Sequence, residues 1–244
     1  MLFWRLKRSA KAFPLQPAAD IPVVCYVTDR YSLMRHGGVV DSCVVLDELA
    51  RSIQNAIEAG VDAVQFREKG LSGASLLGAA VGAVAAASGT ATRILVNDRV
   101  DVAVASGAAG VHLGGASLPV GEVYKWRSAR RELAHFLIGA SCHSLEAGMA
   151  AARAGADYLF FGPVFATPSK ALFGPAQGLE RLAEICGQVS VPVVAIGGID
   201  WQTAPRCLRA GASGIAAIRL FQEGRDGGEL RESVAGLKRL ANSK

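Results

Sequence analysis

The chain has 244 residues, of which 51% are hydrophobic and 19% are charged, and its formal net charge is +5. This length and apolar fraction suit one domain with a sizeable core, or at most two small ones. The basic excess is modest and no basic stripe with interleaved aromatic residues occurs, so we expect no nucleic-acid partner, although anionic substrates would be attracted. No apolar segment reaches the length of about 20 residues that a membrane span needs, so we expect no membrane association.

The five cysteines, at positions 25, 43, 142, 186 and 207, form no Cys-x-x-Cys pair, and their number is odd. This usage favours a reducing compartment, so we predict a cytoplasmic protein. Residues 1–20 are basic and lack the apolar centre of a signal peptide. We expect them to form an N-terminal extension, either a flexible arm or a packing strand, before a single domain at 21–244.

Short apolar runs rich in β-branched residues alternate along the chain with stretches of helical spacing. The predicted strands are 22–28, 63–67, 94–97, 110–113, 136–141, 158–161, 192–196 and 214–218. Helices are predicted at 45–59, 118–134, 145–154, 179–188 and 229–241. Nearly continuous apolar strands that alternate with helices indicate a parallel sheet whose outer face is covered.

A short glycine motif precedes the second, fourth, sixth and eighth strands. It occupies 59–63, 106–110, 154–158 and 210–214, and its glycine is typical of a helix C-cap that leads into the next strand. Eight β/α units in about 220 residues predict an α/β protein with a single (β/α)₈ TIM barrel and a short N-terminal extension. An open doubly wound sheet is the alternative, and the lack of Gly-x-Gly-x-x-Gly after the first strand disfavours it.

Polar and small residues gather where the predicted strands end, which is where a TIM barrel carries its active site. They are Gln65, Arg67, Lys69, Asn97, Asp98, His112, Ser141, His143, Thr167, Ser169, Lys170, Gly197, Gly198 and Arg219. Arg67 and Lys69 share one face of an extended segment, and with Lys170 they could clamp a diphosphate. The alternative is a rim salt-bridge cluster with Glu68. The pattern favours an enzyme acting on small phosphorylated substrates.

Asn97 and Asp98 offer the oxygen ligands that Mg²⁺ prefers, although Asp98 could instead cap a helix at 99–105. Gly197 and Gly198 would let a phosphate approach the backbone, or could simply form a tight turn. Arg219 could bind the same phosphate or pair with a surface acid.

His143 is placed for proton transfer, because an imidazole can accept and return a proton near pH 7. The alternative is a histidine bonded to a backbone carbonyl. His112 ends a predicted strand, and we expect it to be structural. No Cys/His spacing indicates zinc.

From residue 24 to the last strand the chain resembles the thiamine phosphate synthase/thiazole tautomerase family. Seven motifs match. They are Val-Thr-Asp-Arg at 27–30, Gln-Phe-Arg-Glu-Lys at 65–69, Asn-Asp-Arg-Val-Asp at 97–101, Gly-Val-His-Leu-Gly at 110–114, Gly-Pro-Val-Phe-Ala-Thr-Pro-Ser-Lys at 162–170, Gln-Gly-Leu at 177–179 and Ala-Ile-Gly-Gly-Ile at 195–199.

For a synthase, this resemblance implies a site that couples hydroxymethylpyrimidine diphosphate with thiazole phosphate to give thiamine phosphate and diphosphate. The residues that would hold the pyrimidine diphosphate are Gln65, Arg67, Lys69, Asn97, Ser141 and Lys170. Asp98 would hold Mg²⁺. The residues that would hold the thiazole phosphate are Thr167, Ser169, Gly198, Ile218 and Arg219.

The chain departs from the family pattern at two positions. The family's synthases usually carry Gln-Glu-Asp after His-Leu-Gly, and that Asp is the second metal ligand, whereas Ser117 stands there in this chain. Arg219 replaces the family's usual serine after the eighth strand. The loss of one carboxylate predicts a weakened Mg²⁺ site.

Two alternatives follow from the same resemblance. The tautomerase branch often lacks the metal-ligand carboxylate, and the histidine aligned with His143 moves a proton on a thiazole carboxylate phosphate. A barrel that binds a thiamine precursor without catalysis is the other reading. The retained clamp favours the synthase. Barrels of this size often pair through outer helices, so a homodimer is a further expectation.

Overall fold

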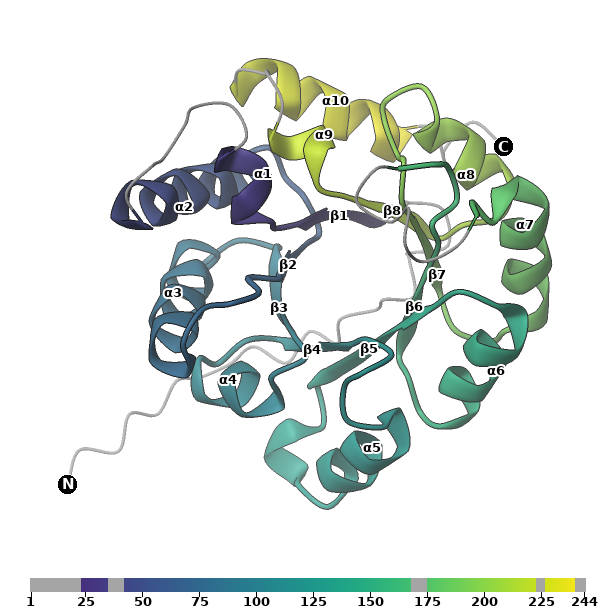
Figure 1. Cartoon of the computed structure of the whole chain (residues 1–244), viewed down its shortest axis with the longest axis horizontal. Helices are drawn as coiled ribbons and strands as arrows, with labels where there is room; N and C mark the ends of the chain where they lie inside the picture. The colour runs from purple at the N-terminus through teal and green to yellow at the C-terminus, as the bar shows by residue number, and fades with distance from the viewer. Residues whose placement is uncertain (1–22, 35–41, 168–174, 223–226, 240–244) are drawn as a thin grey trace.

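Eight parallel strands close into a barrel in chain order, β1 to β8, and helices surround it on the outside (Figure 1). The structure is a computed structural model that describes residues 23–34, 42–167, 175–222 and 227–239. The predicted (β/α)₈ barrel is therefore confirmed, and the open doubly wound sheet is excluded. The proposed extension at 1–20 lies outside the described residues.

All eight predicted strands are present, and their ends differ from the prediction by at most one residue. They are β1 Val23–Val27, β2 Ala63–Phe66, β3 Arg93–Asn97, β4 Gly110–Leu113, β5 Leu137–Cys142, β6 Tyr158–Phe161, β7 Val193–Ile196 and β8 Gly214–Ala217. The four repeat glycines that precede the even-numbered strands all have positive φ, from 72° to 101°, as expected for helix C-caps.

The helices are α1 Arg30–Met34, α2 Ser42–Glu58, α3 Gly73–Ala86, α4 Val100–Ala105, α5 Val120–Ser128, α6 Leu145–Arg153, α7 Gly178–Gln188, α8 Ala204–Arg209, α9 Arg219–Gln222 and α10 Gly227–Arg239. The single helix predicted at 118–134 is wrong: it divides into α5 and a 3-10 helix, η1 Arg131–Leu133. Arg130 breaks it with an extended backbone (φ −130°, ψ 103°). The break lets the chain turn back, and Phe136 packs edge-on against Trp126.

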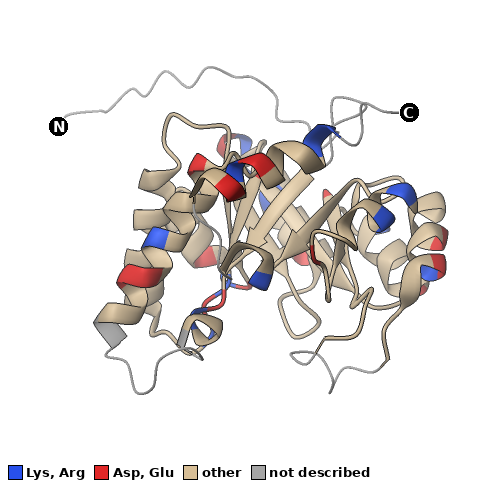
Figure 2. Ribbon diagram, turned by 90° about the horizontal axis from the view of Figure 1, so that it is seen from above, with Lys and Arg blue, Asp and Glu red and all other residues tan. Residues whose placement is uncertain are grey.

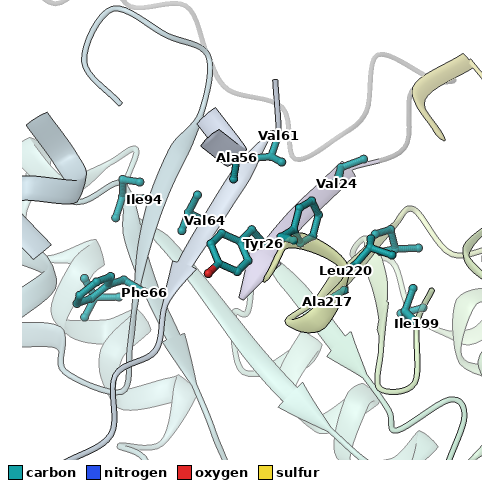
Figure 3. Packing of buried hydrophobic residues seen from close by; sticks show 14 of the residues in the cluster. Val24, Tyr26, Ala56, Val61, Val64, Phe66, Ile94, Ile199, Ala217 and Leu220 are labelled. Atoms are coloured by element: carbon teal, nitrogen blue, oxygen red, sulfur yellow. The ribbon is translucent and has the colours of Figure 1, made fainter. Parts of the chain in front are cut away.

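Side chains alternate between the inside and the outside of the barrel, as the period of a strand requires. Val23, Cys25 and Val27 belong to a cluster inside the barrel. Val24 and Tyr26, from the same strand, pack outward with the layer beneath the helices (Figure 3). This alternation decides which strand residues can face the site and which only hold the helices in place.

Two aspartates at the N-terminal ends of strands occupy the same position of the repeat, immediately before β2 and β6. Each carboxylate accepts a backbone N–H from the preceding strand and pairs with a cation from a helix. The distances are 2.9 Å from Val24 N and 2.7 Å from Lys238 Nζ for Asp62, and 2.7 Å from Ile138 N and 2.5 Å from Arg127 Nη1 for Asp157. Elsewhere, charges of both signs are interspersed over the outer helices (Figure 2).

The cysteine side chains that the structure describes are free thiols, at Cys25, Cys142, Cys186 and Cys207. Burial raises the pKa of Cys25, Cys142 and Cys207 to about 12 and that of Cys186 to about 11. Among the described residues, no helix has the length and apolar character needed to cross a membrane.

Candidate active site

The predicted site residues that the structure describes lie at one end of the barrel, where all eight strands finish. Parallel strands bring their carboxyl ends to one rim, and barrels of this fold carry their active sites there. Arg67 and Lys69 follow β2, Asp98 follows β3, His143 follows β5, Gly197 and Gly198 follow β7, and Ile218 and Arg219 follow β8. Thr167 is the last described residue after β6, and Ser169 and Lys170 lie outside the described residues.

Gln65 and Asn97 form a hydrogen-bonded pair near the mouth of the barrel. Ala63 and Leu95 belong to the cluster inside the barrel, so Gln65 and Asn97, two residues further along each strand, point to the same side. Gln65 Nε2 donates to Asn97 Oδ1 at 3.0 Å, and Gln65 is only 2% exposed. Because Gln65 fixes the Asn97 amide, its orientation is set before any ligand arrives.

In the segment Arg67-Glu68-Lys69, the acidic side chain is paired elsewhere and the two basic side chains are not. The Glu68 side chain is 1% exposed, and its Oε2 accepts from Arg30 Nη1 at 3.2 Å and from Arg30 N at 3.1 Å. Burial raises the pKa of Glu68, although hydrogen bonds from Thr28 and Arg30 oppose this shift. In the part of the chain that the structure describes, neither Arg67 nor Lys69 forms an ion pair. Glu68 therefore pairs with Arg30, and the alternative cluster of Arg67 and Lys69 with Glu68 does not form among the described residues, so the two cations are available to an anionic ligand.

Asp98 is the one non-glycine residue with positive φ (68°) among the described residues. Its N–H donates to His112 O at 2.8 Å, and the residue is exposed at the rim. An unfavourable backbone conformation at a strand end is typical of a residue held for function. Asp98 is not the N-cap of α4, because Arg99 occupies that position and no side chain caps the helix.

Asp98 offers one exposed carboxylate at the rim that could help to hold Mg²⁺. Ser117 Oγ accepts from Gly114 N at 2.7 Å, so the residue at the second ligand position serves its own loop. No group of three or more His, Cys, Asp or Glu side chains suited to a metal occurs in the described ranges. Mg²⁺ is commonly held by one or two carboxylates together with substrate phosphates, so Asp98 could serve as a single protein carboxylate for the ion.

Gly197 and Gly198 make room for another loop of the protein. A Cβ on Gly198 would lie 2.7 Å from Phe165 Cβ and 2.9 Å from Ala166 O, and a Cβ on Gly197 would lie 2.6 Å from Pro163 Cα. Phe165 N donates to Gly197 O at 3.0 Å. The two glycines thus position the chain that leads to Thr167, whether or not they also contact a phosphate.

His143 follows β5 directly and is exposed, and its Nδ1–H donates to Gly162 O. This is the backbone-carbonyl contact considered as the alternative for this residue. It does not exclude proton transfer, because in the neutral ring the contact fixes the proton on Nδ1 and leaves Nε2 as an acceptor.

Sequence reasoning did not find the contacts that three residues make inside the barrel. His112, expected to be structural, is 1% exposed and its Nε2 lies 2.9 Å from Ser141 Oγ. Tyr158 and Gly139 were not singled out, yet Gly139 lies opposite His112 on the adjacent strand β5, and Tyr158 reaches His112 from β6. The alternation along the predicted strands places all of them on the inner face and could have found them.

The chain is similar to known proteins in both sequence and fold. The family model described as thiamine monophosphate synthase matches residues 38–221. The thiamine-phosphate synthase of Methanoculleus marisnigri is 48% identical over 67% of this chain and 75% of its own length, and that of Methanocella arvoryzae is 43% identical over 70% and 77%. The structure of thiamine phosphate pyrophosphorylase from Pyrococcus furiosus superimposes with a TM-score of 0.75 at 30% identity, covering 89% of this chain and 95% of that one.

Proposed function

The chain belongs to the thiamine monophosphate synthase family, and we propose that its site transfers a pyrimidine-methyl group from hydroxymethylpyrimidine diphosphate to thiazole phosphate. The relatives support the activity of a thiamine-phosphate synthase, a transferase of thiamine biosynthesis. The observation that carries the proposal for the site is the separation of charge after β2. Arg30 neutralises Glu68, and Arg67 and Lys69 are left for a diphosphate.

In this reaction the C–O bond between the pyrimidine methylene and the diphosphate breaks, and the electron pair leaves with the diphosphate. The thiazole nitrogen then donates its lone pair to the pyrimidine-methyl cation, and a C–N bond forms. Negative charge grows on the leaving diphosphate, so Arg67 and Lys69 would stabilise the transition state more than the bound substrate. Lys170 would add a third cation.

The other residues would orient the two substrates. Gln65, Asn97 and Ser141 would hold the pyrimidine diphosphate. The thiazole phosphate would be held by Thr167, Ser169, Gly197, Gly198, Ile218 and Arg219. Holding both reactants at one rim turns a bimolecular step into a nearly unimolecular one.

Mg²⁺, which is typical of this family, neutralises diphosphate charge when it is bound. Asp98 would hold it, and phosphate oxygens of the substrate would complete its coordination. The neutral Ser117 predicts that a higher Mg²⁺ concentration is required than at a site with two carboxylates.

The test supplies both substrates with Mg²⁺ over a wide concentration range and follows thiamine phosphate and diphosphate. Equal amounts of the two products are expected. Binding of both substrates without product at any Mg²⁺ concentration would instead establish the non-catalytic precursor binder.

A second candidate function is thiazole tautomerisation, favoured by the contact between His143 Nδ1–H and Gly162 O. This contact leaves Nε2 to accept a proton from a thiazole carboxylate phosphate and to return it at another position. His143→Gln would abolish the aromatisation of that substrate without affecting the coupling reaction. An unchanged aromatisation rate in the variant would reject this role.

A homodimer and a cytoplasmic location remain predictions, as does the absence of a nucleic-acid partner. Sedimentation equilibrium of the full chain tests the first of these. Cell fractionation tests the second, and a gel-shift titration with duplex DNA and RNA tests the third.

A further inference from the structure

Three side chains form a hydrogen-bonded chain from the barrel interior to its mouth. Tyr158 OH lies 3.0 Å from His112 Nδ1, and His112 Nε2 lies 2.9 Å from Ser141 Oγ. Tyr158 and His112 are each 1% exposed, whereas Ser141 is only partly buried. Ser141 is therefore the member of the Tyr158–His112–Ser141 chain that a ligand at the rim can reach.

Gly139 makes the contact between Tyr158 and His112 possible. The strand register sets His112 of β4 opposite Gly139 of β5, and Gly139 opposite Tyr158 of β6. A Cβ on Gly139 would overlap the Tyr158 Cζ and hydroxyl and would lie 2.6 Å from His112 Nδ1. Its φ is not positive, so this glycine supplies space and not an unusual backbone conformation. The Tyr158 hydroxyl and the His112 ring meet in the space that a side chain at position 139 would fill.

The Tyr158 hydroxyl stays protonated, because burial raises its pKa well above 10. The hydroxyl proton needs an acceptor. Among the described residues, His112 Nδ1 is the atom that lies within hydrogen-bond distance of the hydroxyl. If Tyr158 donates to Nδ1, the neutral imidazole carries its proton on Nε2 and donates to Ser141 Oγ. The opposite tautomer would direct Nδ1–H at the phenol oxygen and leave the buried phenol proton without that acceptor, which is unfavourable.

Burial favours the neutral imidazole, because His112 is only 1% exposed and is packed among aromatic rings. The Phe160 ring centroid lies 4.3 Å from that of His112, and the Tyr158 centroid lies 5.5 Å from it. A positive charge loses its hydration in such a setting. Both hydrogen bonds of the chain can then point the same way, from the phenol to the serine.

We propose that Tyr158 is a positioning residue of this site: through His112 it makes Ser141 a hydrogen-bond donor toward the bound substrate. Ser141 Oγ accepts from His112 Nε2, so its own proton remains for the ligand. The substrate atom that meets Ser141 is therefore an acceptor, either an aromatic ring nitrogen or a phosphate oxygen. The identity of the substrate in this assignment rests on the proposed function. The direction of the hydrogen bonds is independent of the proposed function.

The direction is tested on the unaltered protein by ¹⁵N–¹H correlation NMR of histidine-labelled chain, with His112→Gln used to assign the resonance. The proposal requires the Nε2–H tautomer for His112. An Nδ1–H tautomer would overturn it, and this result is independent of any enzymatic activity.

The effect on the site is tested with Tyr158→Phe, which removes the hydroxyl and keeps the ring. We expect KM for the pyrimidine diphosphate to rise about tenfold, the size expected for one hydrogen bond, with a smaller change in kcat. Tyr26→Phe is the matched control, because Tyr26 is equally buried but its hydroxyl bonds Ser52 and Gln222 outside the barrel wall. It should lower stability and leave KM unchanged. Equal KM effects of the two variants would contradict the proposal.

A double-mutant cycle with Ser141→Ala separates positioning from packing. If Tyr158 acts through Ser141, Tyr158→Phe should have no further effect on substrate binding in the Ser141→Ala background. Additive losses would overturn the proposal. Calorimetry with inorganic diphosphate and with unphosphorylated hydroxymethylpyrimidine identifies the acceptor, since only the ligand that meets Ser141 should bind less tightly to Tyr158→Phe. If neither ligand binds less tightly, the proposal fails even where no turnover can be measured.

Discussion

The two ends of this barrel use charged residues in opposite ways. At the N-terminal ends of the strands, Asp62 and Asp157 are fully engaged, each with a backbone N–H and a helix cation. At the C-terminal rim, Arg67 and Lys69 form no ion pair within the described residues, and Asp98 is exposed in a strained backbone conformation. Charges at the first end are satisfied by the protein itself, whereas Arg67 and Lys69 have no ion-pair partner among the described residues and are proposed to bind a ligand.

The difference separates stability from function in a single fold. A carboxylate that accepts from the neighbouring strand ties two strands together, and a helix cation then fixes the outer layer. An unpaired cation at the rim contributes nothing comparable to stability, but it can neutralise a leaving group. Substitutions at the two ends should therefore change different measurements.

The largest effect is expected from Arg67→Gln, which removes a rim charge and leaves a shorter, neutral hydrogen-bonding side chain. We expect kcat/KM to fall by about 10² to 10³, because one donor to the developing negative charge is lost. The melting temperature should stay unchanged, because the side chain has no ion pair to lose. Steady-state kinetics and thermal unfolding measure the two effects.

Arg127→Gln is the matched control at the other end. Arg127 Nη1 donates to Asp157 Oδ2 and to Phe136 O. Its loss should lower stability and leave kcat/KM of the folded protein unchanged. A variant of Arg67 that keeps full activity would remove Arg67 from the clamp.

The next largest effect is expected from Asp157→Asn. The change weakens hydrogen bonds to Ile138 N and Arg127, and the free energy of unfolding should fall by about 2 kcal/mol, as is typical of hydrogen bonds to charged groups. Urea denaturation at pH 7 measures it. Asp101→Asn breaks a more exposed ion pair with Arg99 and should produce no measurable loss. Similar losses in both variants would show that the strand-to-strand contact is not what stabilises this end.

A smaller effect, of the opposite sign, is expected from Ser117→Asp. A carboxylate at the position of the family's second metal ligand should lower the Mg²⁺ concentration for half-maximal rate by about tenfold, since each added charged ligand strengthens binding of a hard cation. Ser117→Asn is the control, because it has the same shape without the charge. A gain that Asn reproduces would mean that the loop geometry, and not the charge, limits the site.

Much of the barrel could be predicted because each strand is an uninterrupted apolar run. The repeat glycines marked where helices end, and Tyr158–Phe161 is a strand at its predicted limits. The helix predicted at 118–134 failed because composition alone does not show that Arg130 adopts an extended conformation. Short helices such as α1 and α9 have too few residues to display a period.

The site was predictable as a set of strand ends but not as a network. Residue types after each strand pointed to the rim, since parallel strands share it. Which charges pair with each other depends on contacts between distant segments, such as Arg30 with Glu68. The role of Gly139 could not be predicted either. Its lack of a side chain makes room for a contact between residues of the two adjacent strands, and that contact is visible only in the structure.

Glu68 is the exception to the contrast between the two ends, and it offers the smallest and most specific test. It lies at the rim, but it is buried and paired with Arg30. Burial raises its pKa above the ordinary value of 4.5, so the folded protein holds this proton more tightly than the unfolded chain does. The stability of the wild type relative to Glu68→Gln should therefore be greatest below pH 4.5 and fall as the pH rises through the raised pKa.

Urea denaturation of both proteins between pH 4 and pH 8 measures this difference, and Glu146→Gln is the control of opposite sign. A hydrogen bond from its own backbone N–H lowers the pKa of Glu146, with a contribution from Ser144. Its contribution to stability should therefore be present above pH 4.5 and be lost as the pH falls. If the advantage of Glu68 grew with pH instead, attraction to Arg30 would outweigh burial. The rim would then stabilise the fold through paired charge, as the opposite end does.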